Sequence, residues 1–67
     1  MKRVVFVEGL HASRRRNALD VAEGFGVKAT LVAPRTYHLH GQDGFVEAVV
    51  RVLVRLKLIE TVEVGET

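Results

Sequence analysis

Cysteine is absent from this chain of 67 residues, which also has a single proline and no tryptophan. The lack of cysteine excludes disulfide bonds and thiolate-ligated metal centres. No uninterrupted apolar run approaches the roughly 18 residues of a membrane-spanning helix. The N-terminal Met1-Lys2-Arg3-Val4 leads into a strand pattern without the cleavage site of a secretory signal. The length predicts one domain over residues 1–67, and the missing apolar span and signal predict a soluble protein in the cytoplasm without membrane association.

Hydrophobic residues make up 48% of the chain and charged residues 27%, a balance that is typical of globular rather than disordered proteins. The formal net charge of +2 is too small to indicate a nucleic-acid partner by itself. A domain of this size buries only about 60% of its unfolded surface. Additional stability therefore has to come from elsewhere, and a partner subunit is a common source.

The first half of the chain has the pattern of a strand followed by a helix. Residues 2–8 (KRVVFVE) are apolar on both faces, as expected for a central strand, and Gly9 ends the run. Ser13 is a predicted N-cap, and a glycine at position 24 or 26 is expected to end the helix in the left-handed conformation. Between these signals, apolar residues recur at helical spacing: Ala18, Val21, Ala22 and Phe25.

A hairpin is predicted next, because residues 27–33 and 36–40 both alternate between apolar and polar side chains. Pro34-Arg35 separates the two strands and favours a turn. Gly41 to Gly44 then break the chain, and Asp43 is a candidate cap for a second helix.

Residues 45–58 admit two interpretations. Their many β-branched residues favour a strand, whereas Glu47, Arg51 and Arg55 recur at the spacing of one polar stripe on a helix. A single strand from Phe45 to Val64 would span about 66 Å, too long for this domain. We therefore predict a helix to about Leu58 and a final strand at 59–64, ended by Gly65.

The predicted order is β-α-β-β-α-β, an α+β two-layer sandwich with a four-stranded antiparallel sheet and two helices on one face. The alternative is a parallel β-α-β-α-β unit in which residues 36–40 form a loop. Because the second helix has apolar residues nearly all round, we also predict a homodimer that packs through residues 43–58. A helix sunk between the sheet and the first helix would explain the same pattern.

Three consecutive arginines, Arg14 to Arg16, lie where the first helix is expected to begin. The N-terminus of a helix carries a partial positive charge, so each exposed arginine there is unfavourable by about 0.3–1 kcal/mol. A bound anion would reverse that effect, because the free backbone N–H groups and the guanidinium groups would both attract it. The predicted anion-binding residues are Ala12, Ser13, Arg14, Arg15 and Arg16. Otherwise the arginines form a solvated face, with Arg16 paired to Asp20.

Gly9-Leu10-His11-Ala12, followed by an amphipathic helix that ends at Phe25, resembles the histidine-containing phosphocarrier (HPr) family. The resemblance implies that the ring of His11 is the reactive group and carries a phosphoryl group, received from a phosphodonor protein. It also implies that the following N–H groups and Arg14 or Arg15 hold the phosphate. In the family an arginine directly follows the alanine, whereas this chain has Ser13 there, and the family's final helix has no counterpart.

A nucleic-acid-binding function is the alternative. The stretch VFVEGL resembles the first-strand motif of RNA-recognition-motif domains, which implies that Phe6 faces outward and stacks on a base. An open sheet face would supply the polar contacts to a single strand. The residues predicted for this role are Phe6, Lys28, Arg35, His38 and His40, with Thr30 beside them and Arg14 to Arg16 at the margin.

Conventional enzyme chemistry is not indicated, because the sequence has no serine–histidine–acid set, phosphate-binding loop or dinucleotide fingerprint. His38 and His40 have a spacing that can hold a metal, but Asp43 is the only carboxylate near them in sequence. We therefore predict no metal site and no cofactor. A structural or interaction module that dimerises through residues 43–58 is the remaining hypothesis.

Overall fold

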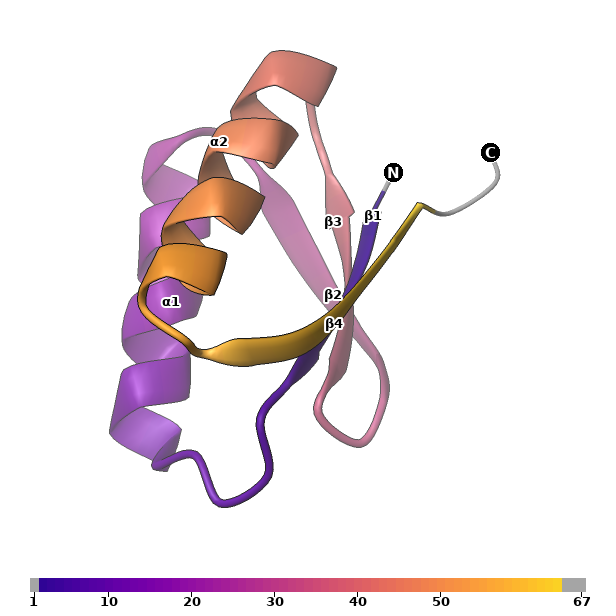
Figure 1. Ribbon diagram of the computed structural model, residues 1–67. Coiled ribbons are helices and arrows are strands. Elements are labelled where there is room, and N and C mark those ends of the chain that lie inside the picture. Colours follow the sequence, from indigo (N-terminus) through magenta and orange to yellow (C-terminus); the bar gives the residue numbers. More distant parts are fainter. Residues whose placement is uncertain (1, 65–67) are drawn as a thin grey trace.

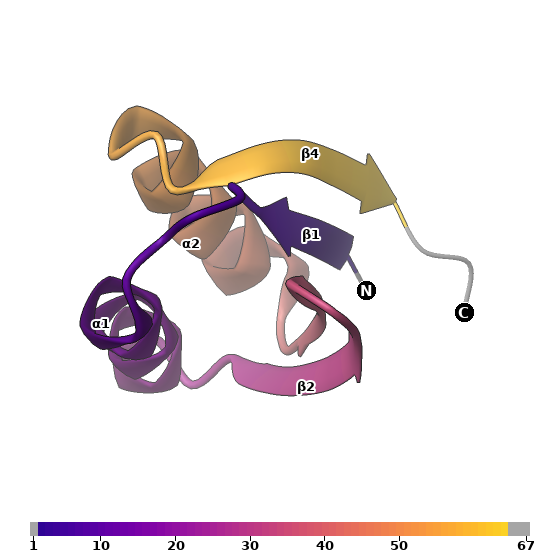
Figure 2. The ribbon, with the colours of Figure 1, turned by 90° about the horizontal axis from the view of Figure 1, so that it is seen from below.

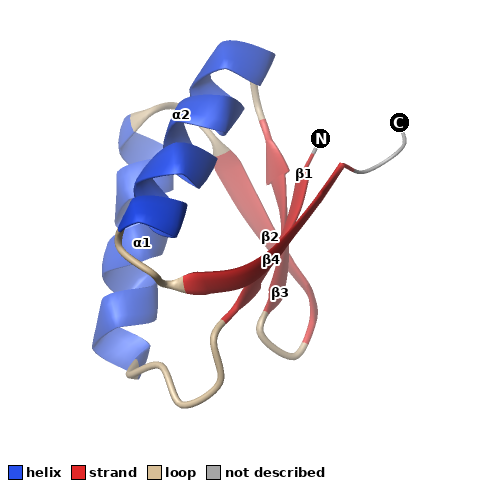
Figure 3. Ribbon diagram, in the orientation of Figure 1, coloured by secondary structure: helices blue, strands red, loops and turns tan. Residues whose placement is uncertain are grey.

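The computed structural model describes residues 2–64, which form six elements (Figure 1). They are β1 (Lys2–Phe6), α1 (Ala12–Gly24), β2 (Lys28–Ala33), β3 (Thr36–His40), α2 (Asp43–Arg55) and β4 (Ile59–Val64). The strands are antiparallel in the order β2-β3-β1-β4. Both helices cover the same face of the sheet (Figures 2 and 3). The predicted sandwich is confirmed, and the parallel alternative is wrong because residues 36–40 pair with two strands.

A single hydrophobic core lies between the helices and the sheet. Alternate residues of the two inner strands point toward the helices, and Val4, Phe6, Tyr37 and Leu39 are all buried there. The rings of Phe6 and Tyr37 meet edge to face, with centroids 5.4 Å apart. The helices complete the core with Ala18, Ala22, Val46, Val49, Val50 and Leu53. β1 therefore has the central place in the sheet that its apolar run predicts.

Both helices end in the same hydrogen-bonded motif, with a left-handed residue just after the C-cap. In α1 this residue is Gly26, with φ 74°, and its N–H donates to the carbonyl of Glu23 at 2.9 Å. In α2 it is Lys57, with φ 58°, and its N–H donates to the carbonyl of Val54 at 3.0 Å. The first end confirms the prediction from the glycines. The second end differs from the predicted helix to about Leu58, because α2 ends at Arg55, three residues earlier.

Other element boundaries also differ from the prediction. β1 ends at Phe6 because the chain turns at Glu8 and at Gly9, which has φ 80°. The N-cap of α2 is Gln42, so Asp43 lies in the first helical turn. The glycine expected to end β4, Gly65, lies outside the described residues. Neither helix of the described region has the length and apolar character that crossing a membrane requires.

Candidate anion-binding site at the basic end

The site begins at the N-terminus of α1, where His11 rather than Ser13 is the N-cap. The carbonyl of His11 accepts hydrogen bonds from the N–H groups of Arg14 and Arg15, both at 3.1 Å. No side chain caps the helix, and its first turn contains no acidic residue. Within residues 2–64, the N–H groups of Ala12 and Ser13 have no hydrogen-bond partner. They are therefore available to an anion.

The side chains around this N-terminus have no polar partner among the described residues. His11, Arg14 and Arg16 are exposed and Arg15 is half-buried. Consecutive residues on a helix project about 100° apart, so three arginines in a row diverge. Among the described residues, none of these four side chains forms a hydrogen bond or an ion pair, and the pair expected between Arg16 and Asp20 is absent. The structure therefore places these four residues at the start of one helix, and no hydrogen bond or ion pair within residues 2–64 fixes their side chains.

The antiparallel topology places further cations at the same end of the molecule. β1 ends there, and its Val7 N–H donates to the carbonyl of Leu58, just before β4, at 3.0 Å. The β2–β3 turn lies there too, because Val5 pairs with Thr36. α2 ends beside the start of α1, since Arg14 and Leu56 line the same groove. We define the basic end by its six cations: Arg14, Arg15, Arg16, Arg35, Arg55 and Lys57.

Arg55 and Lys57 of the basic end are missed by the sequence analysis. They are 39 or more residues away from Arg16 in the chain, and only the antiparallel packing of the two helices brings them close. Both are exposed. The segments that form this end, residues 7–16, 33–36 and 55–60, contain the acidic residues Glu8 and Glu60. The six cations of the basic end therefore leave an excess of positive charge. The signal in the sequence is indirect: α2 carries its basic residues at its C-terminal half.

Arg35 has a structural role in this end of the molecule. It occupies the β2–β3 turn with φ 60°, and its Nη1 donates to the carbonyl of Phe6 at 3.0 Å. The same Nη1 lies 3.5 Å from Oε1 of Glu60. Its own carbonyl accepts the N–H of Phe6 at 2.7 Å. These contacts fasten the turn to the end of β1 and the start of β4, so the guanidinium is less free to bind a ligand than the other cations of the basic end.

The two helices have opposite relations to their own dipoles. In α2 the acidic residues Asp43 and Glu47 precede the basic residues Arg51 and Arg55, the order that a helix dipole favours. In α1 the order is reversed, because the arginines begin the helix and Asp20 and Glu23 follow. The two helices run in opposite directions in the fold. Their basic halves therefore lie at the same end of the molecule, and their acidic halves at the other. The charges of α1 therefore match its neighbour and not its own dipole.

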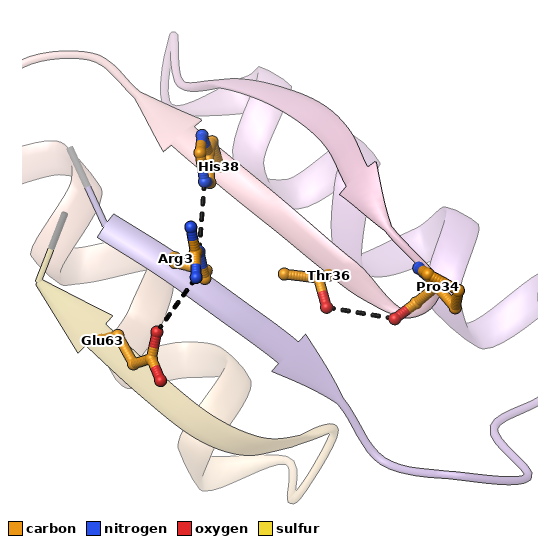
Figure 4. A network of polar contacts seen from close by, with 5 residues as sticks. All are labelled: Arg3, Pro34, Thr36, His38 and Glu63. Carbon is orange, nitrogen blue, oxygen red and sulfur yellow. Dashed lines mark hydrogen bonds and ion pairs between the residues drawn. The ribbon is translucent and has the colours of Figure 1, made fainter.

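Phe6 is buried in the core and only 1% exposed, which corrects the nucleic-acid alternative, in which its ring faces outward. Of the other residues predicted for this role, Lys28, Thr30, His38 and His40 do lie on the side of the sheet away from the helices, whereas Arg35 lies in the β2–β3 turn. Arg3 joins two strands there, since its Nε donates to Nε2 of His38 at 3.2 Å and its Nη1 lies 3.5 Å from Oε2 of Glu63 (Figure 4). Lys28 and His40 pair across β2 and β3, with Thr30 beside them.

No cluster of three or more potential metal ligands occurs in residues 2–64. His38 and His40 are neighbours, with ring centroids 6.1 Å apart, but His38 accepts the hydrogen bond from Arg3. The positive charge of that guanidinium opposes a cation at the same ring. Comparison of the chain with protein-family models, with curated proteins and with solved structures finds no match.

Proposed function

We propose that this protein binds a phosphate-bearing ligand at the basic end. The observation that carries the proposal is the start of α1, where uncapped N–H groups, three arginines and the absence of acidic residues coincide. Each exposed arginine there is unfavourable for the helix by about 0.3–1 kcal/mol. A bound anion converts this repulsion into attraction, because it lies between the dipole and the guanidinium groups. The function therefore accounts for a feature that destabilises the free chain.

The distribution of the cations favours a ligand with several phosphates. Arg14 and Arg16 at the start of α1, and Arg55 and Lys57 at and just after the end of α2, are all exposed. A single phosphate cannot contact cations that are spread over these two segments. A short single strand of nucleic acid presents phosphates at regular intervals and suits such a spread. The proposal includes the predicted cytoplasmic location, where nucleic acids and phosphorylated metabolites are abundant.

The proposal is tested with a fluorescein-labelled single-stranded oligonucleotide, followed by fluorescence anisotropy over a range of salt concentrations. The double variant Arg14→Ala/Arg16→Ala should bind more weakly, and its plot of log affinity against log salt should be shallower by about 1.4, the contribution of two phosphate contacts. The matched control is Arg3→Ala/Lys28→Ala, which removes two exposed cations from the sheet face. Equal binding by the first variant and the natural chain, or a loss confined to the control, would refute the proposal.

Phosphoryl transfer to His11 is a second candidate at the same site. The N-cap position of His11 favours it, because this residue directly precedes the free N–H groups of Ala12 and Ser13. In this reaction a ring nitrogen of His11 attacks the phosphorus of a phosphohistidine donor, and the donor imidazole leaves. Incubation with such a donor protein should then give an acid-labile adduct of one phosphate that His11→Ala abolishes. An unmodified chain after incubation excludes the transfer but leaves non-covalent binding to be measured separately.

A further inference from the structure

The surface of the helix layer, α1 and α2 together, contains apolar side chains that no other described segment covers. Phe25 and Phe45 lie where α1 ends and α2 begins, with ring centroids 6.5 Å apart, and they are 38% and 48% exposed. At the opposite end Leu56, 53% exposed, borders a groove of about 170 Å³ between the helices. Arg14 and Val21 of α1 line the same groove. An apolar strip therefore follows the junction of the two helices.

The charged residues of the two helices are sorted between the two ends of the helix layer. At one end are the basic residues of both helices, and at the other are their acidic residues. The basic set is Arg14, Arg15, Arg16, Arg51 and Arg55, and the acidic set is Asp20, Glu23, Asp43 and Glu47. One of the acidic residues already has a partner within the chain, since Oε1 of Glu47 lies 3.7 Å from Nζ of Lys2. The helix layer thus exposes apolar side chains at the junction of its helices and carries opposite charges at its two ends.

We infer that the helix layer binds the helix layer of a second copy of this chain, with the two copies antiparallel about a two-fold axis. This orientation places the basic end of each copy over the acidic end of the other and packs the apolar strips together. A parallel arrangement would oppose like charges at both ends. The charge order of α1, which opposes its own dipole, favours such a dimer because it places the basic residues of both helices at the same end of the layer. The inference extends the predicted dimer from α2 alone to both helices and gives it an orientation.

The charge pattern favours the helix layer over the edge strand β2, which also exposes apolar side chains. Leu31 of this strand is 60% exposed and Val32 is 46% exposed, but the only charged residue of the strand is Lys28. Pairing of β2 with a second β2 would therefore match no opposite charges. A residue of β2 consequently serves as the control for the apolar contact.

Two charge-exchange variants test the inference by sedimentation equilibrium in the absence of nucleic acid. The first is Arg14→Glu/Arg16→Glu and the second is Asp20→Lys/Glu23→Lys. Each brings α1 into line with its own dipole, so both should remain folded, which circular dichroism checks. The natural chain should sediment as a dimer, each variant alone as a monomer, and their equimolar mixture as a heterodimer. A monomeric natural chain, a mixture that stays monomeric or variants that still dimerise alone would each overturn the inference.

The apolar strip has its own matched test. Leu56→Gln should raise the dissociation constant of the dimer about tenfold or more, the effect expected when a buried leucine contact is lost. Leu31→Gln changes a similarly exposed leucine on β2, 60% against 53%, and should leave the constant unchanged. The opposite result would assign the dimer to the edge strand and refute the helix-layer interface. Because Arg14 and Arg16 belong to both surfaces, a bound oligonucleotide and a second copy compete. The sedimentation test contains no nucleic acid, and Leu56→Gln changes no cation of the basic end, so failure of the dimer is distinguished from failure of oligonucleotide binding.

Discussion

Replacement of Lys57 by glycine should stabilise this protein, although it removes a side chain. Lys57 ends α2 with φ 58°, at the position that Gly26 occupies in α1 with φ 74°. A residue with a Cβ atom is strained in this conformation by about 1–2 kcal/mol, whereas glycine is not. Glycine also increases the entropy of the unfolded chain, which opposes the gain by about 0.5–1 kcal/mol. The net increase in the free energy of unfolding should be about 0.5–1 kcal/mol.

The assay is thermal unfolding followed by circular dichroism at one low protein concentration, so that association does not contribute. For a domain of this size, Lys57→Gly should raise Tm by about 2–8 °C. Lys57→Ala is the control, because it removes the charge and keeps the strain, and its Tm should stay near that of the natural chain. Gly26→Ala should lower the stability by about 1 kcal/mol. Equal stability of Lys57→Gly and Lys57→Ala would refute the explanation by backbone strain.

Two further predictions concern the β2–β3 turn and the core. Arg35→Ala should destabilise the chain by about 1–2 kcal/mol in urea unfolding, because the carbonyl of Phe6 and the carboxylate of Glu60 lose a charged partner. Arg35→Gly should be less harmful than Arg35→Ala, since it relieves the positive φ; a larger loss for glycine would contradict this account. Leu53→Ala should lower the stability by about 2–5 kcal/mol, whereas Leu31→Ala should change it by less than about 0.5 kcal/mol, because Leu53 is 1% exposed and Leu31 60%. Similar unfolding midpoints for these two variants would show that the core is not where the structure places it.

The elements of this fold could be predicted where local signals agree. Gly24 and Gly26 mark the end of α1, and Pro34-Arg35 marks the hairpin turn, because both signals act on the backbone over a few residues. α2 ends three residues before the position that the sequence predicts, because Lys57 adopts a backbone conformation that is typical of glycine. No local sequence pattern indicates the left-handed conformation of Lys57. Tertiary contacts favour it, because the next residue, Leu58, is buried in the core and its N–H donates to the carbonyl of Leu53.

The candidate site was only partly predictable for a related reason. The sequence places His11 and the three arginines at a helix start, and the structure confirms the helix start. The sequence does not show which face of β1 the helices cover, because residues 4 to 7 are apolar on both faces. Phe6 could therefore be assigned to the open face in one hypothesis, whereas it lies in the core.

The sequence alone determined the order of the elements, because hydrophobic periodicity and turn residues act within a few positions of the chain. Tertiary structure decided which distant residues share a surface. Arg55 and Lys57 join the arginines of α1 only because antiparallel strands force the two helices to run in opposite directions. The same packing gives the reversed charges of α1 a common polarity with α2. Electrostatic interactions depend on distance in space, so the combined charge of residues far apart in the chain is set only when the fold has brought the two helices side by side.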